Sequence, residues 1–289
     1  MIQEDKFGLR PMWLASLEIY EEIAKICERH HLIYYVSDGT LLGAIRHKGF
    51  IPWDDDLDMS MPRPDYEQFK KYAKEELPVH LKFLDWTNTK EFGLLFGKVH
   101  ETRKEKILEL EEKVGYKMSN GLFVDIFPID GCPVGRLATH WYRIRTFVLR
   151  AMIRFRLTEY KRESKRGRLV WMSGMFFSCL FPWLRTQSQL MRLFEKPVKW
   201  YPYETSALVG RGCSDGNVLR KRPVPRSVWE NRCQVEFYDR KVSVPSEYDR
   251  CLRNEYGDYM KLPPVEQQKP THSFSYRNPW WLGPTGHKF

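Results

Sequence analysis

Residues 51–61 read IPWDDDLDMSM and combine a strand pattern with a run of carboxylates. Three apolar residues alternate there with three polar ones: Leu57, Met59 and Met61 with Asp56, Asp58 and Ser60. A two-residue period is typical of a β-strand with one buried face, so the pattern predicts a strand anchored in a hydrophobic core. We therefore expect the side chains of Asp56 and Asp58 to project from the same face of that strand.

The carboxylates of this segment predict a metal site. Asp54, Asp56 and Asp58 place three negative charges within five residues, and such charges repel one another strongly unless a cation lies between them. Oxygen ligands of this kind suit Mg²⁺ or Mn²⁺, and Mg²⁺ commonly shares its remaining positions with substrate phosphates and water. A solvated acidic turn is the alternative, but the alternating apolar residues favour a strand in a core.

Two further segments carry candidate site residues. Asp125 is the one charged residue in the stretch GLFVDIFP (residues 121–128). A lone buried carboxylate is costly, so we expect Asp125 to face the acidic strand, although a carboxylate that caps a nearby backbone amide would give the same pattern. Asp38, Gly39 and Thr40 follow a predicted strand over 32–36 and precede a short helix, where backbone N–H groups can hold phosphate oxygens.

Residues 1–130 have the pattern of a mixed α/β unit. Apolar residues spaced by three and four predict amphipathic helices over 11–31 and from Pro64 onward, and one or two helical turns over 40–46. Apolar and β-branched runs predict strands over 32–36 and near 81–85, 94–99 and 122–127. The alternation of these elements predicts the α/β (α+β) class.

The positive charge of the chain is concentrated in one segment. The 289 residues carry 47 Lys and Arg against 37 Asp and Glu, a net charge of +10. Between Arg136 and Arg168, eleven basic residues accompany two acidic ones, a local excess of nine. This segment begins with the pattern of a basic amphipathic helix. It leads into Leu169–Leu184, which is sixteen residues without a charge, whereas a membrane-spanning helix needs roughly 20 apolar residues. Either a membrane-surface contact or a buried core helix fits this composition.

Composition also bounds the class and location of the protein. Hydrophobic residues make up 42% of the chain, enough for a core, which excludes a disordered protein. The six cysteines are far apart and form no C-x-x-C pair, so we expect reduced thiols in an intracellular protein. The N-terminus lacks the basic start and apolar core of a signal peptide. We therefore expect a cytoplasmic protein, with a peripheral contact to the inner face of the membrane.

Residues 37–58, SDGTLLGAIRHKGFIPWDDDLD, closely resemble the LicD family, which includes bacterial phosphocholine transferases and the fukutin-type ribitol-phosphate transferases of animals. The resemblance continues in VDIFP (124–128) and YGDYMKLPP (256–264). It implies a polymerase-β-like nucleotidyltransferase core with a mixed sheet over 1–134, a helical variable lobe over 135–220, and a C-terminal family segment over 221–289 that packs on the core.

The resemblance also implies a reaction and a set of site residues. The metal, Mg²⁺ or Mn²⁺, would be held by Asp56, Asp58 and Asp125, with Asp54 matching the family pattern as well. The donor would be CDP-choline or a related CDP-alcohol, and the acceptor a sugar hydroxyl of a cell-surface glycan, such as lipopolysaccharide or teichoic acid, or of its lipid-linked precursor. Asp38, Gly39 and Thr40 match the substrate-binding turn, and Asp125 is a candidate to accept the hydroxyl proton.

Basic residues near the carboxylates are candidates for holding donor phosphates. Arg46 and Lys48 precede the acidic strand, and Lys98 alternates out of an apolar one. Ordinary surface cations, or a lysine whose stem alone is buried, are the alternatives. Two other functions are also considered. The same metal triad serves nucleotidyltransferases that move NMP from an NTP to a small acceptor. The basic segment also fits a nucleic-acid-binding protein, although its charge-free apolar run is unlike a nucleic-acid groove.

Overall fold

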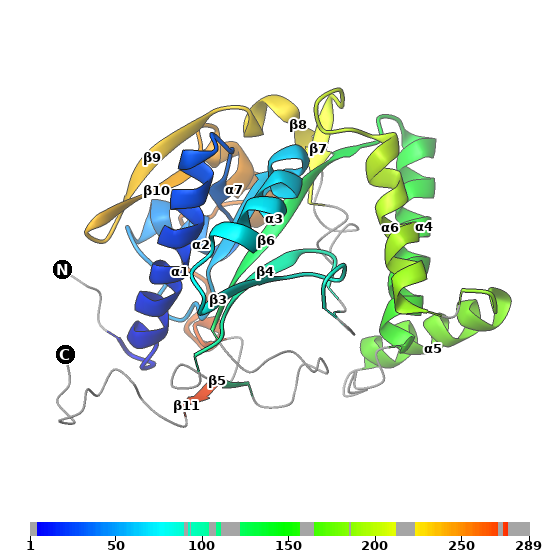
Figure 1. Cartoon of the computed structure of the whole chain (residues 1–289), viewed down its shortest axis with the longest axis horizontal. Helices are drawn as coiled ribbons and strands as arrows, with labels where there is room; N and C mark the ends of the chain where they lie inside the picture. The colour runs from blue at the N-terminus through cyan, green and yellow to red at the C-terminus, as the bar shows by residue number, and fades with distance from the viewer. Residues whose placement is uncertain are drawn as a thin grey trace.

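The computed structural model describes residues 5–89, 92, 94–103, 108–110, 122–156, 165–184, 186–211, 223–270 and 274–276. A seven-stranded mixed sheet runs through its centre (Figure 1). Five strands lie in the order β1 (Tyr35–Val36), β2 (Asp58–Pro62), β6 (Phe123–Cys132), β4 (Gly97–Glu101) and β3 (Leu81–Leu84). The long strand β6 also pairs with β7 (Leu208–Gly210), which pairs with β8 (Val224–Pro225). The predicted α/β class is confirmed.

Register places the candidate residues on one face of this sheet. Strands β2 and β6 are parallel, with Asp58 opposite Asp125, and β4 is antiparallel to β6, with Lys98 opposite Asp125. Side chains of directly paired residues share a face, and those of their immediate neighbours along each strand point the other way. Asp58, Asp125 and Lys98 therefore lie on one face, and Met59 and Ile126 on the other.

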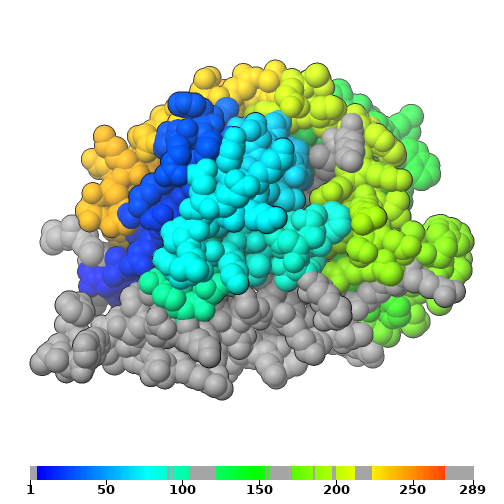
Figure 2. Space-filling model, viewed as in Figure 1, coloured from blue at the N-terminus to red at the C-terminus, as the bar shows by residue number. Residues whose placement is uncertain are grey.

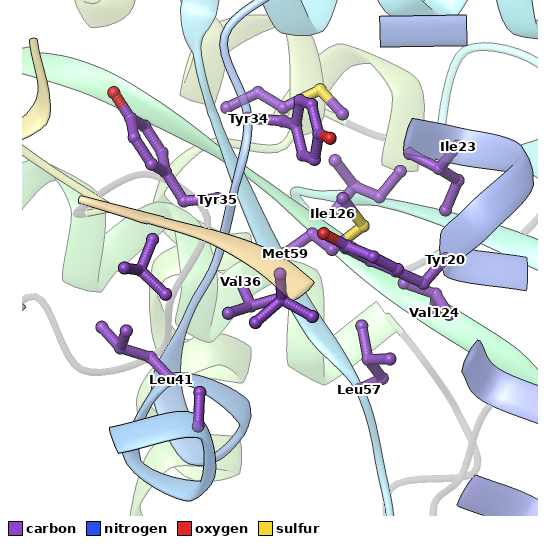
Figure 3. Packing of buried hydrophobic residues seen from close by; sticks show 14 of the residues in the cluster. Tyr20, Ile23, Tyr34, Tyr35, Val36, Leu41, Leu57, Met59, Val124 and Ile126 are labelled. Atoms are coloured by element: carbon purple, nitrogen blue, oxygen red, sulfur yellow. The ribbon is translucent and has the colours of Figure 1, made fainter. Parts of the chain in front are cut away.

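The opposite face forms the main hydrophobic core. Helices α1 (Arg10–Arg29) and α3 (Arg63–Glu76) pack on it and cover much of the sheet in the space-filling view (Figure 2). Figure 3 shows Tyr20 and Ile23 of α1 packed beside Met59, Val124 and Ile126, all of which are buried. Removing these apolar surfaces from water stabilises the sheet and leaves its polar face available for chemistry.

The helices match the predicted periodicity, but the acidic strand begins later than predicted. Helix α1 confirms the prediction for 11–31, and α2 (Asp38–Arg46) confirms the helical turns over 40–46. The expectation that Asp56 lies within the strand is wrong, because β2 starts at Asp58. A turn in which the Asp54 N–H donates to the Ile51 carbonyl at 2.9 Å, and a 2.7 Å hydrogen bond from Trp13 Nε1 to the Asp54 carbonyl, hold the preceding residues outside the sheet.

A helical lobe stands beside the sheet. It consists of α4 (Arg136–Arg156), α5 (Lys165–Leu180) and α6 (Gln187–Trp200), which lie together on one side of the molecule (Figure 1). The lobe has a second hydrophobic cluster, whose buried members are Tyr142, Leu149, Met152, Ile153, Leu190, Met191 and Phe194. Among the described residues, no helix combines the length and apolar composition needed to cross a membrane.

The C-terminal segment packs against the main core. It contains the short helix η3 (Arg226–Trp229), the hairpin of β9 (Arg232–Phe237) and β10 (Arg240–Pro245), α7 (Tyr248–Tyr256) and η4 (Val265–Gln267). Phe237, Val242 and Val244 of the hairpin belong to the main cluster. A separate pair of strands joins β5 (Leu108–Leu110) to β11 (Phe274–Tyr276).

Candidate active site

The start of α2 is hydrogen-bonded directly to the start of β2. The Thr40 hydroxyl accepts the Asp58 N–H at 2.9 Å, and the Asp58 carbonyl accepts the Ser37 N–H at 2.9 Å. Thr40 and Ser37 are both buried. These two bonds fix the Gly39-Thr40 turn against the residue that opens the strand, so the turn and the Asp58 carboxylate occupy one site.

Asp125 lies beside Asp58 on the neighbouring strand. Its N–H donates to the carbonyl of Leu57 at 3.1 Å, so the parallel pairing extends to the residue directly before β2. The Asp125 carboxylate forms an ion pair with Lys98, whose ammonium also lies 3.5 Å from the centroid of the Phe123 ring. Both charged side chains are largely buried. The sequence predicts that Asp125 faces the acidic strand, and Asp58 lies opposite it on β2. The structure adds Lys98, which lies on β4, the strand on the other side of β6.

A cluster of carboxylates lies beside Asp58 and is formed by Asp54, Asp55 and Asp56. One oxygen from each lies within 4.8 Å of the others. Asp54 Oδ2 is buried and has no hydrogen-bond partner among the described residues. The same oxygen would lie 2.3 Å from a Cβ built on Gly39, so the absence of a side chain at Gly39 allows the carboxylate to approach α2 this closely.

The electrostatics of the cluster favour a bound cation. Burial, followed by the charges of Asp56, Asp125 and Asp54, raises the pKa of Asp58 well above its usual value, and the Lys98 charge opposes this only in part. Burial and the neighbouring Asp56 and Asp55 raise the pKa of Asp54 in the same way. Hard oxygen ligands with surplus negative charge and an unsatisfied buried oxygen fit Mg²⁺ or Mn²⁺.

A buried arginine that the sequence patterns did not reveal joins this site to the rest of the fold. Arg211, directly after β7, forms an ion pair with Asp38, the first residue of α2. Its Nη2 lies 3.6 Å from Glu255 Oε1 on α7, and its guanidinium carbon lies 5.0 Å from the centroid of the Phe127 ring. Asp38 has a φ of +49°, a region that few residues other than glycine adopt. The ion pair holds the first turn of α2 in this conformation.

The structure brings most of the predicted site residues together. Those that meet around the starts of α2 and β2 are Asp38, Gly39, Thr40, Asp54, Asp56, Asp58, Lys98 and Asp125. Asp55, which the sequence patterns did not single out, lies in the cluster as well.

Arg46 and Lys48 lie toward the other end of α2. Thr40 and Arg46 are separated by six residues, about 9 Å along a helix. Arg46 Nη1 donates to the Tyr259 carbonyl at 2.7 Å. Lys48 is exposed, and its backbone carbonyl accepts the N–H of Tyr238. Their contacts tie α2 to the C-terminal segment, and their role in phosphate binding stays a prediction.

Comparison with known proteins places this site in a family. The family model described as LicD/FKTN/FKRP, nucleotidyltransferase domain, matches residues 31–147, which include all the carboxylates of the site. The chain is 30% identical over 268 residues to the lipopolysaccharide cholinephosphotransferase LicD of Haemophilus influenzae. The aligned region covers 92% of this chain and 97% of that protein. Shorter matches join it to uncharacterized proteins of Rickettsia typhi (34% over 58 residues, 20% of this chain and 19% of that one) and Rickettsia prowazekii (36% over 52 residues, 18% and 20%).

Proposed function

The chain belongs to the LicD family, and we propose that it is a LicD-type enzyme that transfers phosphocholine, or a similar phospho-alcohol, to a sugar hydroxyl. The observation that carries this proposal is the pairing of Asp58 with Asp125 beside the Asp54–Asp56 cluster and the Gly39-Thr40 turn. The acceptor would be a cell-surface glycan of the lipopolysaccharide or teichoic acid type, or its lipid-linked precursor. The similarity to the Haemophilus influenzae transferase over nearly the whole of both chains supports this choice.

We further propose that the donor is CDP-choline or a related CDP-alcohol. The acceptor hydroxyl oxygen attacks the phosphorus that bears the alcohol, a new P–O bond forms, and the bond from that phosphorus to the bridging oxygen breaks as CMP leaves. Asp125, oriented by its ion pair with Lys98, is the proposed acceptor of the hydroxyl proton. Alignment of the hydroxyl with the departing CMP would supply a large part of the rate enhancement.

Mg²⁺ or Mn²⁺ is the proposed cofactor, held by Asp54, Asp56, Asp58 and Asp125. When bound, the ion would neutralise charge on the donor diphosphate. Asp56, Asp58 and Asp125 are the ligands that a polymerase-β-like nucleotidyltransferase core implies, and the description of the matching family model as a nucleotidyltransferase domain supports such a core. Asp54 is added because its buried Oδ2 has no hydrogen-bond partner among the described residues.

The Gly39-Thr40 turn is the proposed phosphate-binding element. Backbone N–H groups in the first turn of a helix have no partner within that helix and can donate to phosphate oxygens. Lys98 lies in the site already, through its ion pair with Asp125, and can add positive charge near the donor. Arg46 and Lys48 could contribute only if the donor reaches along α2 toward the C-terminal segment.

A CMP-release assay on the carboxylate variants tests the proposal. Asp58→Asn and Asp125→Asn should each abolish release from CDP-choline in the presence of glycan acceptor, because each removes a ligand charge without changing side-chain volume. EDTA should abolish it reversibly. Circular dichroism and the thermal midpoint serve as the folding control. Near-normal turnover of Asp58→Asn at saturating Mg²⁺ would show that Asp58 is not a required ligand.

A further inference from the structure

Helix α5 exposes an apolar stripe. Leu169, Met172, Phe176 and Leu180 follow one another at steps of three and four residues, so they lie on one side of the helix. Their exposed fractions are 68%, 56%, 58% and 51%. Trp183, just beyond the helix, is exposed as well. Single exposed apolar residues are ordinary, whereas a continuous stripe of large ones marks a surface that is covered by something else.

The other side of α5 packs tightly on α4, so the stripe is not an unfinished contact within the lobe. A Cβ on Gly174 would lie 2.1 Å from the Ala151 carbonyl oxygen, which shows how closely the two helices approach. Phe155 and Trp171 also pack together across this contact, with their ring centroids 5.1 Å apart. Helix α5 is therefore not the buried core helix that its composition allowed, because one side of it is exposed.

Helix α4 extends the exposed apolar surface. Leu137, Ile144 and Ala151 are spaced by seven residues and so share one side of α4. Helix α5 contacts that side at Ala151, but Leu137, Trp141 and Ile144 remain exposed nearer the start of α4. This side of α4 is thus exposed in its first half and covered by α5 at Ala151, and the other buried apolar residues of the helix belong to the lobe cluster.

The charge of these two helices is of one sign. Helix α4 contains six arginines, of which Arg145 and Arg150 pack against α6. The first turn of α5 contains Lys165, Arg166 and Arg168, and neither helix contains an Asp or Glu. Large apolar side chains combined with exclusively positive charge are typical of a protein surface that lies on anionic lipid, where the apolar side chains enter the headgroup boundary and the cations contact the headgroups.

We propose that the helical lobe docks on an anionic bilayer surface through the α5 stripe and the exposed half of the α4 stripe, so that the protein is peripheral on the inner face of the membrane. A second copy of the chain is the competing occupant. The charge argues against it, because two such lobes placed face to face would bring like charges together. A docked lobe would give the enzyme access to a lipid-linked acceptor, but the docking does not depend on the proposed reaction.

Vesicle flotation with the full-length chain tests the surface. Wild-type protein should float with phosphatidylcholine vesicles that contain phosphatidylglycerol, bind phosphatidylcholine alone much more weakly, and lose binding as salt is raised. Phe176→Glu with Leu180→Glu should lower the partition coefficient by at least about tenfold, because two apolar side chains are replaced by anions. Val79→Glu is the matched control, since Val79 is 93% exposed in the loop between α3 and β3 and should leave binding unchanged.

Each outcome decides the proposal. Leu169→Glu supplies an independent stripe variant if the double variant does not fold, and sedimentation velocity on the same samples reports self-association. Binding to neither vesicle, equal binding to both, or undiminished binding of the stripe variants would overturn the proposal. Loss of a wild-type dimer in the stripe variants without any vesicle binding would assign the surface to a second copy instead. Flotation is independent of CMP release, so vesicle binding by an inactive protein would retain the docking surface while refuting the proposed reaction.

Discussion

Gly39→Ala is a test of how closely the acidic cluster must approach α2. Gly39 is the second residue of this helix, and a Cβ there would lie 2.3 Å from Asp54 Oδ2, 3.1 Å from its Cγ and 3.2 Å from its Oδ1. An ordinary contact begins near 3.4 Å, so the carboxylate must retreat by about 1.1 Å. The Asp54 backbone cannot move freely, because its carbonyl accepts the Trp13 indole N–H.

The Gly39→Ala substitution should lower activity while leaving stability nearly unchanged. A displacement of about 1 Å in a positioned group commonly costs on the order of 10²-fold in rate, so we expect kcat to fall by about that factor. Alanine is more favourable than glycine in a helix by about 1 kcal/mol, which offsets part of the strain from the contact. The thermal midpoint should therefore change little while turnover falls.

Steady-state CMP release and a thermal melt on the same samples measure both quantities. Gly210→Ala is the matched control, because a Cβ there would meet its nearest atoms at 3.7 Å and should leave turnover unchanged. A Gly39→Ala enzyme with kcat within about threefold of wild type would refute the view that the Asp54 carboxylate must lie against the first turn of α2.

Three further predictions follow from other contacts. Arg211→Lys, which loses the planar guanidinium that pairs with Asp38, should lower kcat/KM for the donor by roughly tenfold in steady-state assays, and an unchanged value would remove Arg211 from the site. Asp130→Asn breaks the buried pair with Arg63 and should cost about 3–5 kcal/mol in urea unfolding, and an unshifted midpoint would contradict this. Burial lowers the pKa of His100 from 6.5 to about 3. Between pH 6.5 and about 3, the unfolded chain therefore binds a proton at His100 that the folded chain excludes, so the free energy of unfolding decreases as the pH falls. His100→Gln should remove a slope of up to about 1.4 kcal/mol per pH unit over that range, and equal slopes for variant and wild type would refute the assignment.

Periodicity predicted the elements whose pattern is local. Helix α1 and the apolar face of β2 follow from spacings within a few residues, since a buried side must recur with the period of the backbone. The residue at which β2 starts could not be predicted from local spacing. Its position depends on the Trp13 indole, 41 residues before the Asp54 carbonyl that it holds, and no local pattern encodes such a contact.

The contacts that complete the site are also long-range. Lys98 meets Asp125 through the antiparallel register of β4 and β6, and Arg211 meets Asp38 only after the chain has passed through the helical lobe. The resemblance to the LicD family identified the carboxylates but not these cations. Similarly, the apolar composition of α5 did not distinguish a buried helix from an exposed one, because that depends on which side α4 covers.

The mass of the acceptor after reaction tests the proposed transfer most directly. The protein would be incubated with CDP-choline, Mg²⁺ and a glycan acceptor, and the glycan analysed by mass spectrometry alongside a parallel reaction with CTP. The proposed mechanism predicts a gain equal to phosphocholine, with CMP released in equal amount and no product from CTP. A nucleoside monophosphate on the acceptor, with pyrophosphate released from CTP, would contradict it and show a nucleotidyltransferase.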